Sequence, residues 1–291
     1  MKKFFSTMIM IVMLLVCCLS FSACGEELVN VEVKFMVGSE EKTIEFVLYK
    51  HLAPESVGQF EDLVEDGYYN DLIMYKTNVQ GSAIAIGQYK ATADGIAYNA
   101  AYDKVATING EFAKGGTAGS NLLANKGAIC VWRWWEESRG GLSASGYETG
   151  SLGAIMLPLS SSFNDNTNDG ATLIAVMGHV ADADKAEYEK LVDSASKAWA
   201  EVDEYHVFYI LRNGSLDRII LTEEEYEDMV EDGVYTETKT VNNETQEFNY
   251  DIIDPTAEET ADEYKLNKYK NAIISVPTKD YMISIASVTI K

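Results

Sequence analysis

Short β-forming segments separated by turns constrain the fold of this chain more than any other sequence feature. Apolar residues alternate with polar residues over 31–37, and after Gly38-Ser39 a second β-rich run covers 43–49. Side chains with a period of two face opposite sides of a strand, so these runs predict a hairpin. Further strands are expected over 72–76, 128–135, 153–159, 171–180, 205–211, 218–221 and 281–290. The sequence therefore predicts a mainly β fold.

A few segments have helical rather than strand spacing. Pro54 suits a first helical turn and Gly67 suits a C-terminal cap, which predicts a helix over 54–66. Apolar residues also recur with helical spacing over 183–199. A third helix is expected after Thr222, because three glutamates follow it in the order of a capping box. The polar stretch 236–263 shows only weak patterning.

The N-terminal segment is predicted to direct export and not to form part of the fold. Lys2 and Lys3 precede an apolar run, and Cys24 follows Ser22-Ala23. This order resembles a bacterial lipobox, with Phe21 where leucine is usual. It implies that residues 1–23 are a lipoprotein signal peptide, that Cys24 is lipidated, and that 24–30 form a tether at the extracytoplasmic face of the bacterial membrane. The alternative, an ordinary cleaved signal with a chance cysteine, stays open.

The charge balance excludes several classes of partner. The chain has 46 acidic and 23 basic residues, for a net charge of −23. Removal of residues 1–23, which contain two lysines and no acid, would change this to −25. Such a surface repels phosphates, so we expect neither nucleic-acid binding nor polybasic docking to a membrane. The same removal leaves only Cys24 and Cys130, and Cys130 lies in an apolar run that predicts burial.

Several sequence words occur in the order found in cyclophilin-type peptidyl-prolyl isomerases. They are 45–60, Gly67-Tyr68-Tyr69-Asn70, 108–112, 121–133, 169–180 and 286–290. The chain resembles that family over about 31–199 and 276–291. The resemblance implies an eight-stranded antiparallel barrel capped by two helices. Residues 200–275 would then be an acidic α+β insertion before the last strand.

The reaction of this family requires a particular environment. Rotation about an X-Pro bond is slow because amide resonance opposes it with a barrier of about 20 kcal/mol. A catalyst holds the proline ring in an apolar pocket and donates hydrogen bonds to the twisted amide. In the family an arginine supplies these donors, and Lys76 occupies its position here. Lysine keeps the charge but loses the planar fork of donors, so Lys76 is a reduced candidate for the catalytic group.

The resemblance also assigns the remaining groove positions. They are Tyr75, Ser82, Ala85, Trp132, Arg133, Gly153, Ile155 and Thr172. Ser82 replaces a phenylalanine, Ala85 a glutamine and Ile155 the pocket phenylalanine. We therefore expect an isomerase-family protein with a degenerate site and weak or no activity. The alternative is a non-catalytic scaffold that binds proline-containing peptides or protein clients in the rebuilt groove.

Two further features bear on function. The aromatic run 132–135 could form a binding surface near the groove or pack into the barrel, and both interpretations stay open. The three histidines, His51, His179 and His206, are scattered and lack the spacing of a zinc site. The sequence thus predicts neither a metal nor another cofactor.

Overall fold

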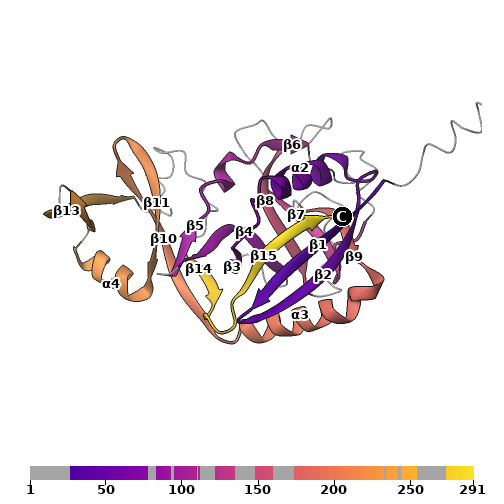
Figure 1. The fold of residues 1–291 in the computed structure, drawn as a ribbon. Helices are drawn as coiled ribbons and strands as arrows, with labels where there is room; N and C mark the ends of the chain where they lie inside the picture. The colour runs from indigo at the N-terminus through magenta and orange to yellow at the C-terminus, as the bar shows by residue number, and fades with distance from the viewer. Residues whose placement is uncertain are drawn as a thin grey trace, which may run out of the picture.

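The predicted mainly β architecture is confirmed. A computed structural model describes residues 27–77, 83–92, 95–109, 111, 122–134, 148–159, 174–232, 234–241, 244–253 and 273–291. Eight antiparallel strands follow one another around a barrel, which the pairing of the first with the last closes (Figure 1). In spatial order they are β3 (Leu72–Thr77), β15 (Ile283–Ile290), β1 (Leu28–Val37), β2 (Glu40–Tyr49), β9 (Ile174–Val180), β7 (Ala128–Trp134), β8 (Glu148–Pro158) and β4 (Ala83–Thr92).

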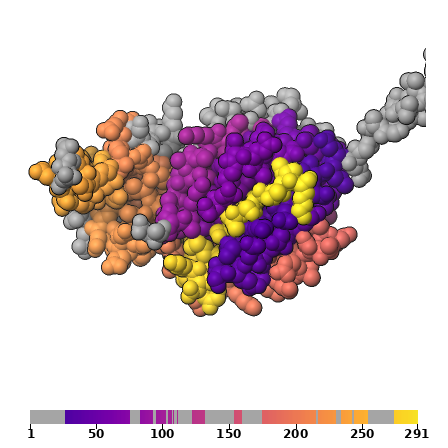
Figure 2. Space-filling view, viewed as in Figure 1, coloured from indigo at the N-terminus to yellow at the C-terminus, as the bar shows by residue number. Residues whose placement is uncertain are grey.

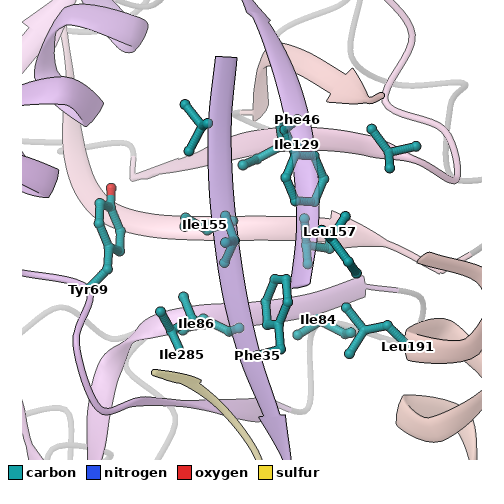
Figure 3. Packing of buried hydrophobic residues seen from close by; sticks show 14 of the residues in the cluster. Phe35, Phe46, Tyr69, Ile84, Ile86, Ile129, Ile155, Leu157, Leu191 and Ile285 are labelled. Carbon is teal, nitrogen blue, oxygen red and sulfur yellow. The ribbon is translucent and has the colours of Figure 1, made fainter. Parts of the chain in front are cut away.

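The interior of the barrel is the main hydrophobic core. Alternate residues of each strand point inward, as Val31, Val33 and Phe35 do on β1, each with 0 or 1% of its surface exposed. Figure 3 shows Phe35 and Phe46 packed against inward residues of the facing strands. Burial of so many large apolar side chains, at about 25 cal/mol per Å², is the main contribution to stability.

Two helices pack on this core from outside the barrel. Helix α2 (Pro54–Glu65) contributes Val57 and Phe60, and helix α3 (Lys185–Ala198) contributes Tyr188 and Leu191. They lie on opposite sides of the barrel in Figure 1. Their bounds agree with the predicted helices to within one or two residues. Gly67 follows α2 with a φ of 66°, as its predicted capping role requires. Short elements complete this part: β5 (Gly95–Tyr98), η1 (Tyr102–Lys104), β6 (Thr107–Asn109) and η6 (Asp182–Asp184).

The insertion before the last strand has its own strands, helix and small core. Its elements are β10 (Val202–Arg212), β11 (Ser215–Thr222), α4 (Glu223–Asp232), β12 (Val234–Val241), β13 (Glu244–Ile253) and β14 (Ile273–Pro277). Phe208, Leu221 and Met229 are buried together between the strands and α4. The predicted capping box is present, because Glu225 N–H donates to Thr222 Oγ1 at 3.3 Å and Thr222 N–H donates to Glu225 Oε2 at 2.8 Å.

Strands β12 and β13 form a hairpin in a polar stretch for which the sequence predicted no strands. Thr236, Thr238 and Thr240 are exposed on one face of β12, while Tyr235 and Glu237 alternate with them on the other. Since both faces carry polar residues, the apolar period of two that identifies a strand is absent. No helix among the residues that the structure describes is long and apolar enough to span a membrane.

Candidate functional site

Strands β3 and β4 carry two of the expected groove positions. Tyr75 of β3 lies directly opposite Ala85 of β4 in the ladder. Their neighbours Met74, Ile84 and Ile86 point into the barrel core, so Tyr75 and Ala85 point away from it, as a groove on the outside of the barrel requires. The period of two thus places both residues on the outer face of the barrel.

The insertion covers this outer face. Val207 of β10 and Ile274 and Val276 of β14 are buried in one cluster with Tyr75 and Ala85. Ile73 and Tyr89 complete the buried set, with Ile96, Tyr98, Tyr205, Ile220 and Met282 packed around it. The exposed fraction is 0% for both Tyr75 and Ala85. The outer face of the barrel has become the inside of a second core.

Strand pairing explains how the insertion reaches this position. The first part of β3 pairs with β15 at Ile73, as the barrel requires. The last part pairs instead with β14, through Thr77 opposite Ile274 and Lys76 opposite Ser275. Strand β14 pairs in turn with β10, and β10 with β11. Strand β3 therefore belongs to the barrel and to a second sheet, β5-β4-β3-β14-β10-β11, which curls around the new core.

The hydroxyl of Tyr75 has no polar partner in this core. Its oxygen is buried and forms no hydrogen bond within the part of the chain that the structure describes. The ring instead contacts Tyr89 edge to face, with 4.9 Å between centroids. Burial raises the pKa of Tyr75 well above its ordinary value of 10.0, so the phenol stays neutral. A neutral, enclosed phenol cannot supply charge to a substrate.

The comparisons with known proteins identify the barrel. The family model described as cyclophilin type peptidyl-prolyl cis-trans isomerase/CLD matches residues 32–151. The chain contains a cyclophilin-type domain.

Solved structures similar to this chain include cyclophilins of low identity. The cyclophilin-type isomerase of Cryptosporidium parvum is 16% identical with a TM-score of 0.36, over 57% of this chain and 85% of that one. The Mimivirus cyclophilin is 14% identical with a TM-score of 0.38, over 60% of this chain and 80% of that one. A search of curated proteins found no match.

Lys76, which the sequence resemblance places at the family's arginine position, lies next to the insertion. Its backbone is paired with Ser275 of β14, while its side chain is outside the described part of the structure. The side chains of Trp132 and Arg133 on β7 are likewise outside the described part, and Gly153 on β8 has no side chain to line a groove. Ser82, Thr172 and Cys24 fall outside the described residues altogether.

Ile155 lies in the core of the cyclophilin-type domain and lines no groove. It is 2% exposed and packs beside Ile84, Ile86 and Val131 inside the barrel (Figure 3). Its neighbour Ala154 points outward, where its main-chain and Cβ atoms lie against Gly87. Successive residues of a strand point to opposite faces. An alignment to a family motif that is shifted by one residue therefore exchanges core and surface positions.

Other candidate groups of the domain do not form a site. Cys130 is fully buried, as predicted, and burial raises the pKa of its thiol far above the ordinary value. Across the described ranges, no three His, Cys, Asp or Glu side chains could together hold a metal ion. A shallow pocket of about 380 Å³ beside α2 is lined by residues including Gln59, Leu63 and Ile108, and by none of the expected groove residues.

The sequence did not indicate that the insertion would cover the groove face. Val207, Ile274 and Val276 are ordinary apolar strand residues, and only the long-range pairing of β14 with β3 places them over Tyr75. An apolar outer position such as Ala85, where the family has a polar glutamine, was the available signal. An outer barrel residue that loses its polarity suggests a covering element.

Proposed function

We propose that the protein is a lipid-anchored extracytoplasmic member of the isomerase family with weak or no isomerase activity. In this proposal the barrel is a scaffold that presents the acidic insertion to protein partners. The observation that carries the proposal is the complete burial of Tyr75 and Ala85 beneath Val207, Ile274 and Val276. Partner contact is assigned to the insertion because these groove positions are not accessible.

The buried face conflicts with the requirements of the reaction. An isomerase lowers its barrier by holding an exposed X-Pro segment and donating to its amide nitrogen in the twisted state. At Tyr75 and Ala85 a substrate would first have to displace apolar side chains that are packed against them. Replacement of the arginine by Lys76 removes the forked donor, and loss of one transition-state donor typically costs about 3 to 4 kcal/mol. The covered groove face and the loss of the forked donor both lower the expected isomerisation rate.

The lipid anchor is a separate part of the proposal. It rests on the position of Cys24 after an apolar segment and Ser22-Ala23. Incorporation of a radiolabelled fatty acid in the producing bacterium would test it. We expect label on the wild-type chain and none on Cys24→Ser, with Cys130→Ser as the matched control that retains the label. Equal labelling of wild type and Cys24→Ser would exclude an anchor at Cys24.

A cis/trans assay on a short X-Pro peptide tests the catalytic part. We expect the chain that begins at residue 25 to leave the uncatalysed rate essentially unchanged. Lys76→Arg should not create robust activity, because Tyr75 and Ala85 stay covered. Strong acceleration that Lys76→Ala abolishes would overturn the proposal. Lys90→Ala is the matched control, since it removes a lysine from the neighbouring strand β4.

A further inference from the structure

The distance between the anchor and the folded domain is very short. Strand β1 begins at Leu28, so only three residues separate it from Cys24. Four Cα-to-Cα steps reach at most about 14 Å, at roughly 3.3 to 3.6 Å per residue. If Cys24 carries lipid, as the proposed function holds, the surface around Leu28 must stay at the bilayer.

The insertion joins the barrel at the other end of the same strand. Strand β1 has ten residues, which span about 30 Å. At its far end Val37 pairs with Ile283, and Gly38 N–H donates to Met282 O at 2.9 Å. The chain leaves and re-enters the barrel near this point, where Thr278 N–H donates to Glu201 O at 3.0 Å. Figures 1 and 2 show the indigo start of β1 at one end of the molecule and the orange insertion at the other.

Charge is distributed unevenly between these two ends. Residues 200–275 contain 20 acidic and 6 basic residues, so this quarter of the chain carries −14 of the −25 expected after processing. Bacterial membranes present anionic headgroups, which repel acidic surfaces within a Debye length of about 8 to 10 Å. Repulsion therefore favours the orientation in which the insertion is far from the bilayer.

From these three observations we infer that the end of the barrel around Leu28 is the membrane-contacting surface and that the insertion points away from an anionic bilayer. Leu28 is 46% exposed and supplies apolar contact at the interface. Lys291 lies at the same end, because its backbone N–H donates to Asn30 O at 2.9 Å. Lys239, on the β12–β13 hairpin of the insertion, marks the outer end.

The two lysines provide a matched pair for footprinting. Their side chains are 45% and 41% exposed, so free protein should react at both. The chain beginning at Cys24 is coupled to maleimide-headgroup lipids in vesicles that contain phosphatidylglycerol. Cys130 does not compete, because its thiol is buried with a raised pKa. Coupling bypasses cellular lipidation, so the outcome is independent of the fatty-acid labelling test.

Labelling with a bulky amine-reactive polymer is then measured by mass spectrometry. We expect coupling to lower the rate at Lys291 several-fold and to leave the rate at Lys239 unchanged. A Gly/Ser segment of about twelve residues inserted after Cys24 adds roughly 20 Å of reach and should restore the Lys291 rate. Protection of Lys239, or no protection of Lys291 with the native tether, would overturn the orientation.

Discussion

The guanidinium of Arg218 lies 3.6 Å from the ring centroid of Tyr98, and this contact joins the insertion to the barrel sheet. Arg218 is on β11 and Tyr98 on β5, which are the two ends of the curled second sheet. The same guanidinium donates to the hydroxyl of Tyr209 at 2.8 and 3.1 Å. One side chain thus closes the sheet that surrounds Tyr75.

We expect Arg218→Ala to lower the free energy of unfolding by about 2 kcal/mol, through loss of a partly desolvated cation–π contact and the hydrogen bonds to Tyr209. The free energy of unfolding of Arg218→Lys should lie between those of wild type and Arg218→Ala, because lysine keeps the charge but not the forked guanidinium. Urea unfolding measures the change, and hydrogen exchange should rise in β5 and β11. Lys239→Ala, which removes an exposed cation, should stay within about 0.5 kcal/mol of wild type. If Arg218→Ala cost no more than about 0.5 kcal/mol, as expected for Lys239→Ala, Arg218 would be an ordinary surface residue.

Tyr75→Phe should leave stability unchanged or raise it by about 1 kcal/mol. The hydroxyl is buried without a described partner, and its removal ends a desolvation cost that no hydrogen bond offsets. Tyr68→Phe is the matched control, because the Tyr68 hydroxyl donates to Gly87 O at 3.2 Å and its loss should cost about 1 kcal/mol. Both values come from denaturant midpoints. Marked destabilisation by Tyr75→Phe would indicate a partner, such as a buried water.

The barrel could be predicted from the sequence because apolar and polar residues alternate along its strands. Such alternation indicates that one face of each strand is buried. Val31, Val33 and Phe35 define a buried face by themselves, and Gly38 adopts a φ of 56° at the turn that the sequence placed there. The bounds of α2 could also be predicted, because Pro54 favours the first turn of a helix and Gly67 adopts the positive φ that ends one.

The covered groove could not be predicted, because it depends on pairing between distant segments. Lys76 and Ser275 are neighbours only because β14 replaces β15 along the end of β3. No local property of either segment specifies that register. The placement of Ile155 failed for a related reason, since a match to a family word does not fix which face of the strand a residue occupies.

Glu111 is a buried residue whose importance only the structure shows. It is 5% exposed, and its carboxylate accepts from the N–H groups of Glu55 and Ser56, at 2.9 and 2.8 Å, in the first turn of α2. Because the first N–H groups of a helix have no acceptor in the preceding turn and Glu111 accepts from two of them, Glu111→Ala should cost about 2 to 3 kcal/mol. Glu111→Gln should cost less, since it keeps one acceptor. Glu65→Ala, at the opposite end of α2, is the control and should be nearly neutral; a similar cost there would rule out the capping explanation.

His179 should make stability depend on pH. Partial burial lowers its pKa from the ordinary value of 6.5, so the unfolded chain binds a proton that the folded chain resists. Stability from this residue is therefore present above about pH 6.5 and falls as the pH drops below it. His179→Gln should reduce the loss of stability between pH 7 and pH 5, measured by urea unfolding. A loss of stability in His179→Gln as large as that in wild type would contradict the prediction.

Substitution of glycine by alanine should have opposite effects on stability at Gly178 and at Gly58. A Cβ on Gly178 of β9 would overlap Val47 O of β2 and lie 2.7 Å from Leu48 Cα, so Gly178→Ala must separate two barrel strands. We expect a loss of about 3 kcal/mol or more, as for other overpacked core sites. Gly58 lies inside α2, where an added Cβ would meet nothing within 4 Å, so Gly58→Ala should raise stability by about 0.5 to 1 kcal/mol. Thermal unfolding of both variants measures the two signs, and destabilisation by Gly58→Ala or tolerance of Gly178→Ala would contradict this packing of β2 against β9.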